Sequence, residues 1–83
     1  MKINKYNEFK NVSGSTVREL RIESKLSQQD LAEKLQLLGV QLTSKEISKI
    51  EHDKRLVQDF ELFAFAKVFK VSTDSFNRNS DLK

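Results

Sequence analysis

The stretch from Ser27 to Glu51, SQQDLAEKLQLLGVQLTSKEISKIE, decides the fold because it encodes two short helices and marks the start of each. Ser27 lies three residues before Asp30, and Thr43 lies three residues before Glu46. At this spacing the hydroxyl can accept from a free backbone N–H of the first turn, while the acid accepts from the backbone of the capping residue. The sequence therefore predicts a capping box at the start of each helix.

Apolar residues at helical spacing follow each of the two caps. They are Leu31, Leu35 and Leu38 in the first run and Ile47 and Ile50 in the second. Gly39, between the runs, can adopt the left-handed conformation that ends a helix. Two capped helices with a short connection, in a small basic chain, favour a helix-turn-helix that reads duplex DNA.

The composition indicates a small helical domain. The chain has 83 residues, no cysteine, no proline and only two glycines. This composition disfavours a turn-rich β fold and excludes both a disulfide framework and a Cys-based zinc site. The formal net charge of +3 permits contact with nucleic acid without indicating it. The longest apolar run, Leu62 to Ala66, is too short to span a bilayer, and no signal peptide is evident. We therefore expect a cytoplasmic protein that makes no membrane contact.

The chain divides into a flexible basic arm at 1–12, a single domain at 13–77 and a frayed tail at 78–83. We expect an all-α fold, a compact bundle of five short helices. Ser13 or Ser15 would cap the first helix and Asp59 the fourth. The expected helices lie at about 14–25, 28–38, 44–52 and 60–70, followed by a last helical turn that begins at Ser72 or Thr73.

Six short motifs occur in a characteristic order. They are Val17-x-x-Leu20-Arg21, Ser27-Gln28-x-x-Leu31-Ala32, Ile47-Ser48-x-Ile50-Glu51, Lys54-Arg55, Leu62 with Ala66, and Val71-Ser72. Together they resemble the DNA-binding domain of the lambdoid phage repressor and Cro family of transcriptional regulators. The resemblance implies a bacterial or phage repressor that binds duplex DNA as a homodimer. It implies no cofactor, no metal and no catalytic residue, so we expect no enzyme.

The connection between the second and third helices departs from this family. The spacing from Ala32 to Ile47 is about five residues longer than the family's tight turn. The extra material lies in QLLGVQL, residues 36–42, and resembles a subset of regulators in which the second helix gains a turn. Asp53 stands where the family prefers glycine, and we expect it to be left-handed.

The polar side of the third helix is the candidate for reading DNA bases. By resemblance, Ser44, Lys45 and Lys49 occupy base-reading positions, and Ser48 lies on the same outward side. Lysine can donate to guanine O6 and N7 in the major groove. An ordinary solvated helix face is the alternative. Glu46 can accept from cytosine N4, although its place in the capping box gives it a structural role.

Phosphate contacts are implied for residues that flank the reading helix. They are Gln28, Thr43, Lys54 and Arg55. Gln28 opens a helix, where backbone N–H groups attract a phosphate, and the family uses a glutamine here to brace a side chain of the third helix. The alternatives are an ordinary first-turn glutamine and a solubilising pair of cations.

Arg21 and Glu51 are implied to form a partly buried bridge that fixes the reading helix on its scaffold. His52 has no second histidine or cysteine nearby, so we interpret it as a solvated residue at a helix end. Phe60 and Phe63 either close the core over the first helix and the arm, or form a homodimer contact. The rival function is a protein-interaction module, such as an antitoxin or a sequestering partner of another regulator.

Overall fold

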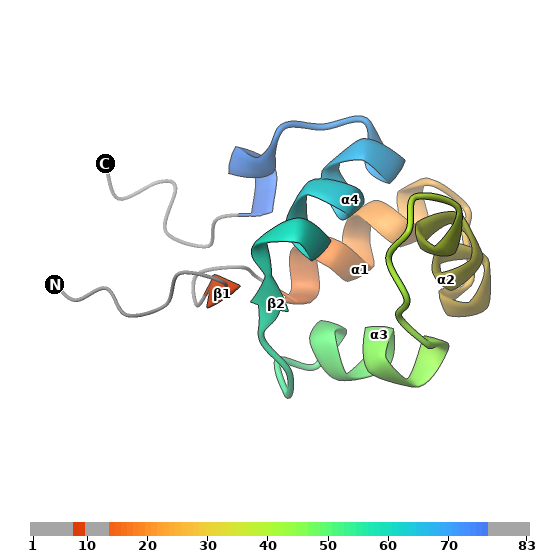
Figure 1. Cartoon of the computed structure of the whole chain (residues 1–83), viewed down its shortest axis with the longest axis horizontal. Helices are drawn as coiled ribbons and strands as arrows, with labels where there is room; N and C mark the ends of the chain where they lie inside the picture. Colours follow the sequence, from red (N-terminus) through yellow and green to blue (C-terminus); the bar gives the residue numbers. More distant parts are fainter. Residues whose placement is uncertain (1–7, 10–13, 77–83) are drawn as a thin grey trace, which may run out of the picture.

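The computed structural model of the chain describes residues 8–9 and 14–76, and helices dominate this part of it (Figure 1). The expected tail at 78–83, Ser13 and most of the arm at 1–12 lie outside these residues. The elements are β1 (Glu8–Phe9), α1 (Gly14–Glu23), α2 (Gln28–Leu37), α3 (Ser44–Glu51), β2 (Val57–Gln58), α4 (Asp59–Phe69) and the 3-10 helix η1 (Thr73–Phe76).

The prediction of five helices is wrong, because the structure has four α-helices within the residues it describes. The expected fifth element is the four-residue 3-10 turn η1. One turn is enough to bury Phe76, whose ring centroid lies 6.3 Å from that of Phe65 and 6.4 Å from that of Phe69. These three rings join the buried aliphatic residues of α1, α2 and α3 in one core.

A short antiparallel pairing of β1 with β2 accompanies the helices, and the domain is otherwise all-α as expected. Glu8 pairs with Gln58, and Phe9 pairs with Val57. From the sequence, the residues of β1 were expected in a loose arm and those of β2 in a loop. Val57 is buried, so this pairing lies directly against the core. Two residues per strand leave no periodic pattern that a sequence could reveal.

Helix α4 begins one residue earlier than expected, and the prediction of Asp59 as its cap is wrong. Gln58 holds the cap position, and its backbone N–H donates to Glu61 Oε1 over 3.0 Å. Asp59 is instead the first helical residue, and its Oδ1 accepts from the backbone N–H of Phe60 over 2.7 Å.

The connection between α2 and α3 is fastened to the core at two points. The Val40 N–H donates to the Leu35 carbonyl over 3.0 Å, and the Val40 side chain packs against the core. Leu42 is buried, with 5% of its surface exposed. Between α2 and Val40, Gly39 has a φ of 86°, which confirms its expected left-handed conformation. The longer connection is therefore an ordered segment whose two apolar anchors fix the start of α3.

Three non-glycine residues have left-handed backbone conformations in the described part of the chain. Asp53 has a φ of 59°, which confirms the expectation for it, and Lys25 and Lys70 have φ values of 61° and 60°. A left-handed conformation costs an L-residue roughly 1–2 kcal/mol, because Cβ approaches the following carbonyl oxygen. Lys70 is the residue that ends α4, a position where glycine is usual.

Candidate nucleic-acid interface

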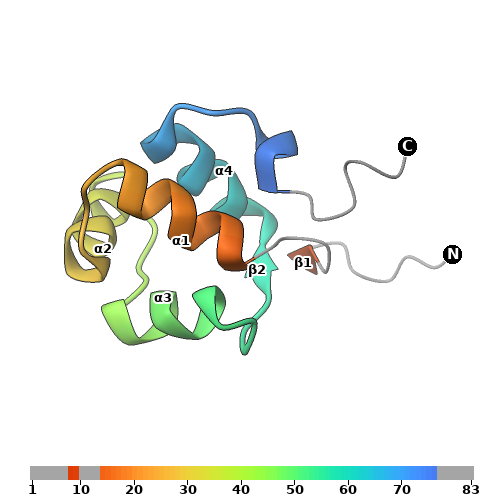
Figure 2. The same cartoon turned by 180° about the vertical axis from the view of Figure 1, so that it is seen from behind.

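Helix α3 lies along one edge of the molecule, at the bottom of both views, with α1 and α4 above it (Figures 1 and 2). Its inward side consists of Ile47, Ile50 and Glu51, which are all buried. Lys45 and Lys49 are exposed, whereas Ser44 and Ser48 are half-buried. The four candidate base-reading residues therefore lie on the side of α3 that the described residues leave open.

The first turn of α3 is held by the capping box predicted from the sequence. The Thr43 N–H donates to Glu46 Oε1 over 2.9 Å, and the Glu46 N–H donates to Thr43 Oγ1 over 3.1 Å. The same arrangement at α2 joins Ser27 and Asp30, so both predicted capping boxes are confirmed. The box holds the Glu46 carboxylate at the start of its own helix.

The hydrogen bond from the Thr43 backbone lowers the pKa of the Glu46 carboxyl below its ordinary 4.5, and the charges of Arg55 and Lys49 act in the same direction. A lowered pKa in the folded state means that ionised Glu46 stabilises the fold above pH 4.5, and that this contribution is lost as the pH falls through the lower, folded value.

Glu46→Gln should remove part of the acid sensitivity of the fold. The stability difference between wild type and this variant, measured by urea denaturation, should shrink from pH 6 to about pH 3. A difference that stays constant over this range would contradict the prediction.

Glu51 anchors the end of α3 to the scaffold through a buried network. The Arg21 Nε donates to Glu51 Oε2 over 2.7 Å, and Arg21 Nη2 donates to Glu51 Oε1 over 3.1 Å. The Gln28 Nε2 also donates to Glu51 Oε1 over 3.1 Å, and Arg21 Nη1 reaches the Leu26 carbonyl over 2.9 Å. The side chains of Arg21 and Glu51 are 13% and 1% exposed. One carboxylate thus joins α1 and the first turn of α2 to α3.

A second contact between α1 and α3 was not evident from the sequence. The backbone N–H of Gly14 donates to Asp53 Oδ1 over 3.1 Å, so a residue two positions beyond the end of α3 helps to cap α1. A Cβ atom at position 14 would overlap with the carbonyl oxygen of Ile50. The two helices approach this closely only because residue 14 is glycine.

The adjacent cations Lys54 and Arg55 have different surroundings. Arg55 makes a bidentate ion pair with Glu61, with Nη1–Oε1 and Nη2–Oε2 distances of 2.9 and 3.0 Å. Lys54 is exposed. From the sequence alone, Lys54 and Arg55 were equal candidates for phosphate contact. The sequence signal for the ion pair was the acidic Glu61 between the apolar residues Phe60 and Leu62.

Two hollows border this part of the molecule. A small hollow of about 270 Å³ lies between α2 and residues 41–44, which lead into the first turn of α3. A larger groove of about 620 Å³ lies between the Leu38–Gln41 connection and α4, where it is lined by Phe60, Phe63 and Lys67. Phe60 and Phe63 are 51% and 60% exposed, so the described residues do not enclose them.

Among residues 8–9 and 14–76 there is no group of three acidic or histidine residues that could hold a metal ion. No helix in this part of the chain is long and apolar enough to cross a membrane.

Two capped helices, the second of which presents lysines on an open outer side, define a helix-turn-helix domain of the kind that binds DNA. The family model of the Cro/C1-type helix-turn-helix matches residues 17–76, and the chain belongs to this family. This confirms the resemblance to phage repressors and Cro. No curated protein and no solved structure matches the chain.

Proposed function

We propose that the chain is a bacterial or phage transcriptional repressor that binds specific duplex DNA with the outer side of α3 in the major groove. The observation that carries this proposal is the exposure of Lys45 and Lys49 on a helix whose other side is locked to α1 and α2 through Glu51. A rigidly held helix of this size fits the groove, and residues near its N-terminus reach base edges. Ser44 and Ser48 complete the base-reading set.

Phosphate contacts would position this reading helix on the duplex. Lys54 supplies an exposed cation just beyond α3, and Thr43 lies exposed at its start. Gln28 and Arg55 would contact phosphate with only some of their N–H groups, because each side chain already donates to a carboxylate of the domain. Lys54 should therefore provide the larger share of the salt-dependent attraction.

Duplex binding measured by fluorescence anisotropy tests the proposal. We expect the wild type to bind random duplex DNA at about 50 mM salt, with an affinity that falls steeply as salt is added. After selection of a preferred site from a random duplex library, Lys45→Ala should weaken site binding about tenfold and relax the preference at one position. Lys54→Ala should weaken binding to all sequences and reduce the salt slope by about one.

Lys34→Ala is the matched control, because Lys34 is also exposed but lies in the last turn of α2 rather than beside α3. It should bind DNA like the wild type. An absence of binding by the wild type at ~50 mM salt would overturn the proposal and favour the rival function, a protein-interaction module.

A homodimer is part of the proposal, with α4 as its contact. Phe63 lies midway between Asp59 and Lys67 on this helix. If two copies of α4 pack antiparallel around a two-fold axis at Phe63, Asp59 of each copy faces Lys67 of the other. The exposed Phe60 and Phe63 would supply the apolar centre that a stable interface needs. The alternative, closure of the core by these rings, would require cover from outside the described residues.

Sedimentation of Phe63→Lys tests the dimer. The substitution should halve the mass of the wild-type particle while the circular dichroism spectrum stays helical, because Phe63 is 60% exposed and makes little contribution to the core. Leu37→Lys, which also introduces a lysine at an exposed apolar position, should leave the mass unchanged. A wild type that sediments as a monomer would contradict this contact.

A further inference from the structure

A further apolar groove of about 490 Å³ runs between the end of α2 and the end of α4, and it shares Leu38 and Lys67 with the groove beside Phe63. We call it the α2–α4 groove. No residue of α3 lines it. Its apolar lining comprises Leu26, Leu37, Leu38, Val68 and Phe69. Leu37 is 87% exposed, the highest value among the large apolar side chains that the structure describes. An exposed leucine beside a groove is the type of feature that marks a contact with another molecule.

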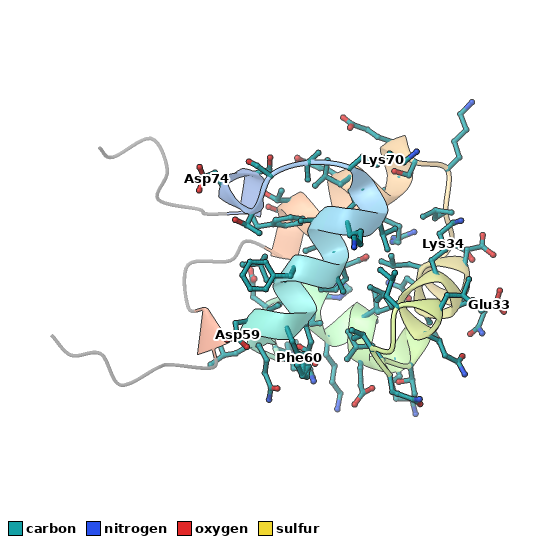
Figure 3. The ribbon with its side chains drawn as sticks, turned by 45° about the horizontal axis from the view of Figure 1, so that its top comes forward. Glu33, Lys34, Asp59, Phe60, Lys70 and Asp74 are labelled. Carbon is teal, nitrogen blue, oxygen red and sulfur yellow. The ribbon has the colours of Figure 1, made fainter. Side chains whose placement is uncertain are left out.

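Lysines surround this apolar lining. Lys34, Lys67 and Lys70 line the groove, and Lys25 lies between two further lining residues, Ser24 and Leu26. All four lysines are exposed, and no acidic side chain lines the groove within the described residues. Figure 3 shows Lys34 and Lys70 on the side of the molecule where α2 meets the end of α4, whereas Asp59 and Phe60 lie at the other end of α4.

Two of these lysines occupy the strained backbone positions described above. Lys25 and Lys70 are both left-handed, and glycine would adopt this conformation without steric cost. Lys25 follows the end of α1 and Lys70 ends α4, and a single left-handed residue commonly ends a helix. Both helix ends carry lysine rather than glycine, which places two positive charges beside the groove.

We propose that the α2–α4 groove binds an acidic amphipathic segment of a partner protein. Apolar side chains at i, i+3, i+4 and i+7 of a helical segment would contact the leucines and Phe69, and flanking carboxylates would face the lysines. Charge complementarity of this kind selects acidic partners over basic ones. The groove has no residue in common with the outer side of α3, so this binding is independent of the proposed DNA contact.

A synthetic peptide of about 16 residues, with leucine at the four helical positions and glutamate at most others, provides the probe. We expect saturable binding to the full chain, followed by anisotropy of a fluorescein label, with a Kd below about 100 µM. Lys34→Glu/Lys70→Glu should weaken binding at least tenfold, and Leu37→Ser about tenfold. The matched control, Lys45→Glu/Lys49→Glu, makes the same charge change on α3 and should alter peptide affinity by less than about twofold.

Several outcomes would overturn the proposal. They are an absence of saturable binding up to about 1 mM peptide, equal losses in the two double variants, and equal binding of a peptide with the same composition in shuffled order. Phosphatidylglycerol vesicles that bind the wild type but not Lys34→Glu/Lys70→Glu, with no peptide binding, would assign the groove to a membrane surface instead. Circular dichroism of each variant checks the fold, and Lys34→Gln/Lys70→Gln replaces the glutamate pair if that pair unfolds.

Discussion

Arg21→Ala should unfold the domain at a much lower temperature than the wild type. The substitution leaves Glu51, whose side chain is 1% exposed, with only the Gln28 amide as a hydrogen-bond donor from the network around it. Removing one partner of a buried ion pair costs roughly 3–5 kcal/mol, because the remaining charge is buried without compensation. A domain of this size is stable by only about 5–10 kcal/mol, so the melting temperature should fall by roughly 15–30 °C.

Arg18→Ala is the control for this prediction, because Arg18 is an exposed arginine of the same helix. Its melting temperature, followed by circular dichroism, should change by no more than about 3 °C. DNA affinity of Arg21→Ala should fall as well at temperatures where it is still folded, since Glu51 no longer fixes the end of α3. If Arg21→Ala and Arg18→Ala melt together, the bridge does not stabilise the protein in solution.

Gly14→Ala should be destabilising, although glycine to alanine usually stabilises a helix by up to about 1 kcal/mol. The new Cβ would overlap with the carbonyl oxygen of Ile50 and lie 2.9 Å from Asp53 Oδ1. The Ile50 oxygen is a backbone atom, so the overlap can be relieved only if α1 moves away from α3. Overpacking of this kind typically costs 1–3 kcal/mol, and we expect roughly 3 kcal/mol from urea denaturation.

Gly39→Ala separates this steric effect from backbone strain. Gly39 has a φ of 86°, but a Cβ there would meet no atom within 4 Å. Its replacement should cost about 1 kcal/mol, the ordinary cost of a left-handed alanine. Equal losses at positions 14 and 39 would show that the contact between α1 and α3 is not the reason for the glycine at position 14.

The four helices, and the starts of α2 and α3, could be predicted from the sequence because their signals are local. The serine and threonine caps, the apolar spacing and the left-handed Asp53 each depend on residues a few positions apart. The pairing of Arg21 with Glu51 came from the family resemblance, not from spacing. The residue spacing within one sequence does not show which distant residues pair, whereas knowledge of a family's fold does.

The features that the sequence missed are contacts between distant residues. The hydrogen bond from Gly14 to Asp53 spans 39 positions, and the pairing of β1 with β2 joins two-residue strands. Neither has a periodic pattern. The ion pair of Arg55 with Glu61 joins the loop before β2 to the first turn of α4, across a strand that the sequence did not predict. For this reason the sequence treated Lys54 and Arg55 as equivalent, although the fold engages only Arg55 with Glu61.

The anchored connection between α2 and α3 has a consequence for changes in the length of this loop. Val40 and Leu42 are fixed to the core, whereas Gly39 lies exposed in open space. Residues could therefore be added or removed around Gly39 without rotating α3, provided that both anchors remain. Variants of this chain with a longer or shorter loop at Gly39 should therefore keep α3 in the same orientation.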